Sequence, residues 1–376
     1  MKFSVGFPAP IPPDLLISTV QYLESKGIES TFSHEHLEPF VRDVFVNLAL
    51  VAASTRQMRL GPNIVNPYTR HPAQVARAIA HLDEISNGRA YLLWGVGHRH
   101  AIEATLGIPH TSFLAHMREA VQLSKMILSG HVPADLEPPI PEEFKLNYRG
   151  EIYQFTDNVV LPSRKVPVGI ATNGPKMLEL AGELCDVVYI GHHTDPEGDL
   201  WAMEQIAQGA AKSGRTLDDI TIHKGIHLTV WPDRKIALDT ISLVGTSFAF
   251  MRPAYRKAMG IKLPFEKEIG DVLDPSSEYY KLWAGKTTMQ MSMELRKLVP
   301  MDLQLRLCVG GTPDDVIQQM TRFYHPRHDT QFIIPIPPHP WRENFVPMIK
   351  LLVEEVIPAV RANADAHSAR AARQAS

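Results

Sequence analysis

The 376 residues include 38 basic and 41 acidic side chains, giving a formal net charge of -3, and 44% of the residues are hydrophobic. This is ordinary globular composition without the long basic run that a nucleic-acid or membrane surface needs, and no apolar stretch approaches the ~18 residues that span a bilayer. The chain enters a strand pattern directly after Met1, without a signal peptide. Its two cysteines, Cys185 and Cys308, have apolar neighbours. We therefore expect buried free thiols in a cytoplasmic protein.

Short apolar segments typical of buried strands alternate with helical patterns along most of the chain. The eight expected strands are Phe3–Phe7, Ser30–Ser33, Met58–Val65, Arg89–Val96, Val166–Thr172, Val187–Gly191, Thr221–Val230 and Gln331–Pro337. The expected helices are Leu15–Lys26, Val41–Thr55, Pro72–Ile85, Pro175–Leu184, Asp199–Lys212, Lys235–Met259, Pro313–Phe323 and Trp341–Val360. Eight strand–helix pairs predict an α/β fold, a parallel (β/α)8 TIM barrel. A doubly wound open sheet is the alternative, weakened because no GxGxxG motif opens the first helix.

Two segments interrupt this alternation. The first, about 101–165, follows the fourth strand and contains a helix, Phe113–Leu128, and a proline-rich stretch; the second, about 261–306, follows the seventh strand. We expect both at the C-terminal face of the barrel or its rim, where barrels build substrate sites. The prediction is a single domain over residues 1–362 and a flexible tail, rich in Ala and Arg, over 363–376.

The clearest local unit is residues 58–97, where a helix that starts at Pro72 and stops at Asn87-Gly88 lies between two strands. Five successive strands, including these two, end in polar or glycine-rich residues. The five ends are Ser33-His34-Glu35-His36, Asn63-Ile64-Val65-Asn66, Gly95-Val96-Gly97-His98-Arg99-His100, Thr172-Asn173-Gly174-Pro175 and Gly191-His192-His193. In a parallel barrel such ends converge on one pocket. Gly97, Gly174 and the helix start at Pro175 would bring backbone amides close to an anionic group.

The histidines allow two interpretations. His34/His36 and His98/His100 are HxH pairs, and residues two apart on a strand share a side, so they could bind zinc. The later strand ends lack the carboxylates that would complete a hydrolytic metal site, so we expect no metal. Because histidine titrates near neutrality, His36 and His98 would suit proton transfer beside a redox centre.

Other polar and aromatic residues have competing roles. Glu35 could be catalytic, could orient His36, or could form a salt bridge to a nearby helix. Asp83 and Arg89 bracket a turn at the opposite, stability face of the barrel and are interpreted as structural. Tyr91 and Trp94 face opposite sides of one strand, and core packing is the favoured role for both.

Four motifs resemble the luciferase-like monooxygenase superfamily. They are Leu60-Gly61-Pro62-Asn63-Ile64-Val65-Asn66-Pro67-Tyr68-Thr69-Arg70-His71-Pro72, Leu82-Asp83-Glu84-Ile85-Ser86-Asn87-Gly88-Arg89, Ile170–Leu178 with Ala181-Gly182-Glu183, and Val309–Asp315. Within the superfamily, the chain is most similar to the branch that uses the deazaflavin coenzyme F420 and includes methylenetetrahydromethanopterin reductases. The resemblance covers most of the barrel but neither insertion.

The resemblance implies a bacterial-luciferase-like barrel with the deazaflavin at its C-terminal face. It matches Glu35-His36 to an acidic-His pair beside the ring and Asn63-Ile64 to a bulge with a non-prolyl cis peptide behind the ring. His36, His98 and Glu35 are the implied catalytic residues. The implied cofactor-binding residues are His36, Asn63, Ile64, Asn66, Val96, Gly97, His98, Ala171, Thr172, Asn173, Gly174, Pro175, Gly191 and His192. One departure is His98, which stands where relatives often carry an acidic residue.

The implied activity is hydride transfer between the deazaflavin and a small organic substrate. A deazaflavin reacts poorly with oxygen, so a reductase or dehydrogenase fits better than a monooxygenase. An FMN-dependent monooxygenase remains the alternative, followed by a metal-dependent hydrolase and a catalytically silent binding barrel. A homodimer is also implied by the family, and no nucleic-acid or membrane partner is expected.

Overall fold

The computed structural model describes residues 1–8, 10–35, 41–97, 102–103, 106–130, 161–162, 164–191, 193–251, 253–262, 293, 296 and 299–375. Within these ranges the strands are β1 Lys2–Phe7, β2 Ser30–Ser33, β3 Arg59–Val65, β4 Leu92–Trp94, β5 Val168–Thr172, β6 Val187–Gly191, β7 Thr221–Val230, β8 Val309–Gly311 and β9 His328–Pro335. All of their pairings are parallel. The sheet order β6-β5-β4-β3-β2-β1-β9-β7, with β6 also paired to β7, closes a ring of eight strands. The (β/α)8 barrel is confirmed, and the open-sheet alternative is wrong.

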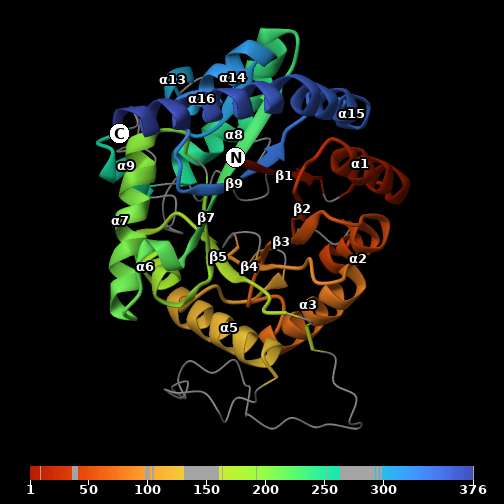
Figure 1. The fold of residues 1–376 in the computed structure, drawn as a ribbon, viewed down its shortest axis with the longest axis vertical. Coiled ribbons are helices and arrows are strands. Elements are labelled where there is room, and N and C mark those ends of the chain that lie inside the picture. The colour runs from red at the N-terminus through yellow and green to blue at the C-terminus, as the bar shows by residue number, and fades with distance from the viewer. Residues whose placement is uncertain are drawn as a thin grey trace.

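Helices surround the ring of strands, with α1, α2 and α3 along the right side of the view, α5 below, α6 and α7 on the left, and α14, α15 and α16 across the top (Figure 1). They are α1 Pro13–Ser25, α2 Val44–Ser54, α3 Pro72–Ser86, α5 Phe113–Leu128, α6 Pro175–Leu184, α7 Pro196–Lys212, α8 Arg234–Met251, α9 Pro253–Ala258, α13 Met301–Gln304, α14 Pro313–Arg322, α15 Trp341–Leu351 and α16 Ile357–Ala375, with a 3-10 turn at Leu217–Asp219 and a π-helical turn at Leu352–Val356. Proline in the first turn suits a helix start because its missing N–H would have no intrahelical acceptor there. Asn87 ends α3 in the left-handed conformation, with φ of 57°, as the Asn-Gly stop signal predicts.

The structure differs from the expected elements at several places. β4 has three residues, Leu92–Trp94, where the sequence pattern predicts a strand over Arg89–Val96. β8 is an additional strand that pairs with Leu228–Val230 at the end of β7, and three residues are too few to give a strand pattern in sequence. The expected helix 235–259 is two helices, because Pro253 starts α9. The last barrel strand begins at His328, three residues earlier than its apolar pattern suggests.

Aromatic rings fill the barrel interior where three glycines make room for them. Phe32, Tyr91, Tyr189 and Phe332 form one buried cluster, and the Phe332 ring centroid lies 5.3, 6.0 and 5.4 Å from those of Phe32, Tyr91 and Tyr189. The glycines are Gly6, Gly61 and Gly225, where an added Cβ would come within 2.6 Å of the side chains of Phe32, Tyr91 and Tyr189, respectively. Glycine inside a strand marks this kind of close approach.

The N-terminal side of the barrel is held by a buried arginine. Arg89, 7% exposed, donates five hydrogen bonds from its side chain, to Ala52 O, Thr55 O and Oγ1, Met58 O and Ser86 O. Asp83 accepts from the Ala90 amide at 3.1 Å. Both residues are therefore structural, as the sequence indicates. Trp94 is also a core residue, and its indole N–H donates to Ser124 Oγ of α5.

The first insertion attaches differently from the expectation. Phe113–Leu128 is the helix α5 of the barrel itself, so the chain after it leads to the start of β5. Leu161, just before β5, packs beside Gly130, just after α5. The described residues that flank 131–160 thus lie at the N-terminal face, and the expectation of the C-terminal face is wrong for them. The second insertion precedes β8, which joins the C-terminal end of β7, as expected.

Three smaller expectations concern the thiols, the chain end and membranes. Cys185 and Cys308 are buried and free, as predicted. The helix α16 continues to Ala375, and Ala364 in its middle is 4% exposed. The flexibility of residues 363–376 stays a prediction. None of the helices in the described ranges combines the length and apolarity needed to cross a bilayer.

The barrel interior predicts a sharp difference between two glycines. Replacing Gly61 with Ala places a Cβ 2.3 Å from the Tyr91 carbonyl oxygen, which cannot move without the strand, whereas a Cβ at Gly174 meets nothing within 4 Å. We expect Gly61→Ala to lower the free energy of unfolding by about 1–3 kcal/mol or more, and Gly174→Ala to change it by less than about 0.5 kcal/mol. Urea unfolding measures both. Equal stabilities would contradict the proposed packing.

Candidate functional site

The polar strand ends lie side by side. β2, β3, β4, β5 and β6 are successive neighbours in the sheet, so their carboxyl ends meet at one edge of the barrel. The described candidate residues at this edge are Glu35, Asn63, Ile64, Asn66, Val96, Gly97, Ala171, Thr172, Asn173, Gly174, Pro175 and Gly191. The candidates His36, His98 and His192 lie outside the described residues, as do Arg99 and His100.

Glu35 is an acceptor for several donors from the loop after β3. Its carboxylate, only 5% exposed, accepts from Asn66 Nδ2 at 3.1 Å, the Asn66 amide at 3.4 Å and Thr69 Oγ1 at 3.2 Å, and it pairs with Arg70 Nε. Of the three roles open for Glu35, the salt bridge is present, although Arg70 comes from the loop before α3 rather than from a helix. A carboxylate that accepts from four donors of the loop after β3 fixes the position of that loop.

Arg70 also reaches the start of α2. Its Nη2 lies 2.5 Å from Asp43 Oδ2, while the other oxygen of Asp43 caps α2 by accepting from the Phe45 and Val46 amides. Burial raises the pKa of Asp43, but the Arg70 guanidinium and the hydrogen bonds from the Val46 and Phe45 amides outweigh it and hold that pKa below its usual range. One guanidinium therefore joins Glu35, before residues 36–40, to Asp43, after them.

The end of β3 has the bulge that the family resemblance implies. The Asn63–Ile64 peptide is cis, and the pairing with β4 shifts register between Asn63 and Val65. Ile64 packs against Gly95, where an added Cβ would lie 2.8 Å from its Cγ1. The bulge thus rests directly on the end of β4.

The end of β4 is braced by a histidine from the loop before α5. His110 is 4% exposed, and its Nε2 lies 2.6 Å from the Val96 carbonyl oxygen. Because a carbonyl only accepts, this nitrogen carries the proton. The Tyr68 ring packs against His110 with centroids 4.5 Å apart, and the Tyr68 hydroxyl donates to Thr111 O at 2.6 Å. Gly97 then turns with φ of 70° beside Asn66, a conformation that favours glycine.

The end of β5 leaves polar groups available. Gly174 is the N-cap of α6 and provides no side-chain hydrogen bond, so amides of the first turn have no cap. The Asn173 side-chain oxygen is buried without a hydrogen-bond partner among the described residues, and so is the Asn63 side-chain nitrogen. These atoms can pair with a ligand that offers both a donor and an acceptor.

The loop after β6 is anchored by a buried charge cluster outside the barrel wall. Asp199 Oδ1 accepts from Lys224 Nζ at 2.5 Å and from His193 Nε2 at 2.8 Å, and His328 Nε2 lies 3.5 Å from the other oxygen. All four side chains are at most 3% exposed. Thr194 adds two hydrogen bonds of 2.7 Å to the carbonyls of Leu305 and Arg306. His193 is therefore a structural anchor of this loop.

Burial and charge shift the pKa values in this cluster. Burial raises the pKa of Asp199, but Lys224, His193 and His328 outweigh it and hold that pKa well below its usual range. Burial lowers the pKa of Lys224 against the attraction of Asp199, and lowers the pKa of His328 to about 3. His328 is thus neutral at pH 7 inside the fold.

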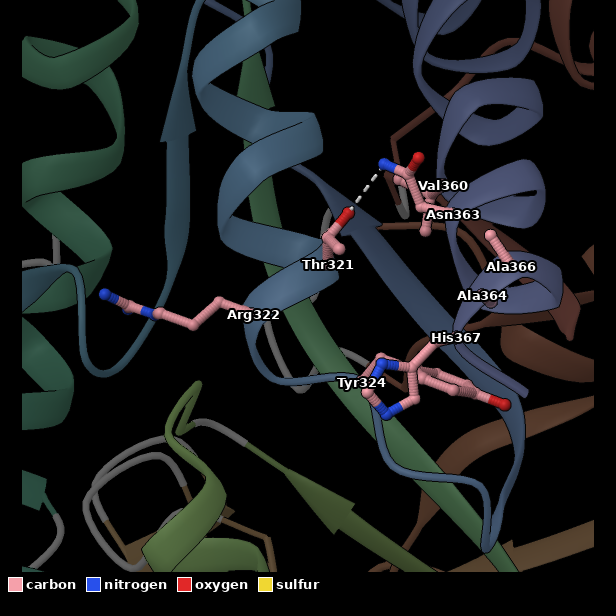
Figure 2. A pocket seen from close by; sticks show the side chains of 8 residues that line it. All are labelled: Thr321, Arg322, Tyr324, Val360, Asn363, Ala364, Ala366 and His367. Atoms are coloured by element: carbon pink, nitrogen blue, oxygen red, sulfur yellow. Dashed lines mark hydrogen bonds between the residues drawn. The ribbon is translucent and has the colours of Figure 1, made fainter. Parts of the chain in front are cut away.

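Two cavities lie elsewhere in the described structure. One of about 360 Å³ lies between α14 and α16, where Asn363 Nδ2 donates to Thr321 Oγ1 at 3.1 Å and the rings of Tyr324 and His367 meet edge to face (Figure 2). The other, of about 320 Å³, opens at the N-terminal mouth of the barrel. Neither contains a candidate residue. Among the described residues, no group of three His, Cys, Asp or Glu side chains could hold a metal ion.

Three residues important to this edge were missed from sequence. Arg70, His110 and Lys224 reach partners 35, 14 and 25 residues away. Arg70 lies in the motif that carries the family resemblance, and a charged residue in that motif could have indicated an ion pair. Lys224 gave a second signal, because a lysine inside an apolar strand pattern needs a buried partner.

The Glu35 network predicts a cost for removing one charge. Glu35→Gln keeps the size of the side chain but loses acceptor strength toward Arg70, Asn66 and Thr69. We expect the free energy of unfolding to fall by about 1–3 kcal/mol, measured by urea unfolding. Glu204→Gln, at an exposed position of α7, is the control and should change stability by less than about 0.5 kcal/mol. No difference between the two variants would refute the anchoring role.

The buried histidine predicts a pH dependence of stability. An unfolded histidine takes up a proton near pH 6.5, whereas His328 in the fold does so at about 3. Between these values the unfolded state binds more protons, so stability falls as the pH falls from 6.5. Asp199 acts in the same direction at lower pH, since its stabilisation is complete above about pH 3.8 and is lost only below it.

His328→Gln should therefore make the stability profile between pH 6.5 and 4.5 shallower, by up to about 1.4 kcal/mol per pH unit. Urea unfolding at several pH values measures this slope. His81→Gln, at an exposed position of α3, should leave the slope unchanged. A His328 variant with the wild-type slope would show that this histidine is not the titrating group.

Comparisons with known proteins agree with this geometry. A family model described as luciferase-like monooxygenase matches residues 2–330. The chain is 28% identical to 5,10-methylenetetrahydromethanopterin reductase of Archaeoglobus fulgidus over 367 residues, covering 96% of this chain and 100% of that protein. It is 28% identical to F420-dependent glucose-6-phosphate dehydrogenase of Beutenbergia cavernae, over 73% of this chain and 84% of that protein. The solved structure of coenzyme F420-dependent tetrahydromethanopterin reductase from Methanopyrus kandleri shares the fold, with a TM-score of 0.73, 23% identity, and 95% and 98% coverage of the two chains.

Proposed function

The chain belongs to the luciferase-like monooxygenase family, and from that premise we propose that it is an oxidoreductase that uses coenzyme F420 to transfer a hydride to or from a small organic substrate. The names of the two relatives, a methylenetetrahydromethanopterin reductase and an F420-dependent dehydrogenase, support this choice within the family. One observation carries the proposal. At the edge where β3 and β5 end, the side-chain nitrogen of Asn63 and the side-chain oxygen of Asn173 are buried without a hydrogen-bond partner among the described residues.

The residues at this edge fit a deazaflavin. Its ring has a polar edge of amide-type donors and acceptors, and its tail carries anionic groups. A buried amide group without a partner costs about 1–3 kcal/mol, so a ring edge that pairs with Asn63 and Asn173 would recover that free energy. The uncapped start of α6 at Gly174, open to approach, suits an anionic group of the tail.

The cofactor, when bound, supplies the carbon that donates or accepts the hydride. The residues of this chain bind and orient it. Asn63, Ile64 and Asn66 would support the ring, and the other proposed contacts come from the ends of three further strands: Val96, Gly97, Ala171, Thr172, Asn173, Gly174, Pro175 and Gly191. His98 and His192 join the binding set by family resemblance.

His36 and His98 are the proposed proton-handling groups, and Glu35 is proposed to hold the start of the segment that contains His36. Its four donors leave it better suited to positioning than to giving up a proton. The proposal also includes a homodimer in the cytoplasm, on the same resemblance.

Titration of the purified protein with F420, FMN and zinc tests the cofactor. We expect saturable binding of F420, seen as a fluorescence change and as binding heat, and weaker or no binding of FMN and zinc. Saturation by FMN without any response to F420 would favour the monooxygenase alternative and exclude our proposal. Binding of F420 without hydride transfer to any tested alcohol, sugar phosphate or pterin would favour the silent barrel.

A variant of His36 tests the mechanism. We expect His36→Ala to lower turnover about 100-fold or more, since a positioned general acid or base contributes about 10²–10⁴-fold, while the Kd for F420 changes much less. His81→Ala is the matched control for loss of an imidazole. Normal turnover in the His36 variant would remove this residue from the catalytic set.

A further inference from the structure

The cavity at the N-terminal mouth of the barrel has a floor and walls made by the strands themselves. Tyr91 and Phe332, from the aromatic cluster, close its inner end. Lys2, Ser30, Arg59 and Asp329 come from the first residues of four strands and line its sides. The cavity is thus separated by the aromatic rings from the edge where the cofactor is proposed to bind.

Two carboxylates at this mouth already have their donors. Glu24 accepts from the backbone amides of Arg56, Gln57 and Met58 at 2.7 to 3.1 Å. Glu29 accepts from the Phe3 amide at 2.9 Å and pairs with Arg361 at 2.8 Å. Both carboxylates are thus held by donors within the protein, Glu24 by backbone amides and Glu29 by a guanidinium.

The third carboxylate, Asp329, is also paired. Its Oδ1 lies 2.7 Å from Lys2 Nζ, and its Oδ2 accepts from Thr330 Oγ1 at 2.8 Å. The His223 ring lies next to it, but the distance from His223 Nδ1 to Asp329 Oδ2 is 3.9 Å, too long for a hydrogen bond.

Donors in the cavity remain without acceptors. The Arg59 guanidinium lies 5.9 Å from the centre of the Tyr91 ring, and its buried Nε has no hydrogen-bond partner in the described part of the chain. His223 is 7% exposed, and its buried Nδ1 likewise has no partner there. The Ser30 hydroxyl, 6% exposed, lies on the same wall. Asp329 is paired with Lys2 and Glu29 with Arg361, so Arg59 is the cation of this lining without a paired carboxylate among the described residues.

We propose that this mouth binds a small oxyanion of the phosphate or sulfate class, with Arg59 as its main charged partner and His223 and Ser30 as further hydrogen-bonding groups. A guanidinium without an acceptor at a desolvated site is the usual partner of such anions, because its N–H groups match two oxygens at once. The cavity, about 320 Å³, has room for one anion and several waters, since a water occupies about 30 Å³ in the liquid. The proposal is independent of the cofactor assignment.

Calorimetric titration of the cofactor-free protein with sodium sulfate, whose charge is constant near neutral pH, tests the site at fixed ionic strength. We expect saturable binding that Arg59→Gln weakens about tenfold or more, as expected for loss of a charge-assisted contact. Arg77→Gln, on the exposed face of α3, should bind sulfate like the wild type. Inorganic phosphate should behave like sulfate.

A second variant distinguishes loss of anion binding from a folding defect in the Arg59 variant. Asp329→Asn removes the negative charge beside His223 and releases Lys2, so it should tighten sulfate binding several-fold, which a general loss of stability would not do. Saturating F420 should leave sulfate binding unchanged, because the two sites lie on opposite faces. Absence of saturable binding, wild-type affinity in a folded Arg59 variant, unchanged affinity in the Asp329 variant, or displacement of sulfate by F420 would overturn the proposal.

Discussion

The rest of the structure depends on how the inside of the barrel is filled. Gly6, Gly61 and Gly225 leave the space in which the rings of Phe32, Tyr91 and Tyr189 meet Phe332 at the centre. The rings set the distance between facing strands and block passage from one end to the other. The C-terminal edge and the N-terminal mouth are therefore separate environments, and each can bind its own ligand without competing for space.

Charged groups hold loops at the ends of the strands. Arg70 joins the ends of β2 and β3 to the start of α2, and Asp199 joins the loop after β6 to β7. The side chains of Glu35, Lys224 and Asp199 are buried in these networks. Removal of one partner would therefore leave a buried charged group without its hydrogen bonds. They fix the position of these loops by charge-assisted hydrogen bonds.

Sequence reasoning succeeded where the pattern is local and failed where it is not. Ser30–Ser33, Val187–Gly191 and Thr221–Val230 were predicted with their observed bounds, because each is a short segment that fits the alternation of strands with helical patterns. The start of β9 was missed because His328, Asp329 and Thr330 are polar residues of a barrel mouth and resemble a loop in sequence. The convergence of Glu35, Asn63 and Asn173 followed from strand order alone. Arg70, His110 and Lys224 could not be assigned, since their partners are fixed only by tertiary contacts.

The double attachment of Arg70 has a mechanical consequence. Glu35 and Asp43 are tied to the same guanidinium, so the end of β2 and the start of α2 are held by one side chain. Loss of Arg70 would release both elements at once, whereas loss of Glu35 or of Asp43 would release only one of them. The guanidinium is therefore the point at which the two elements are mechanically coupled.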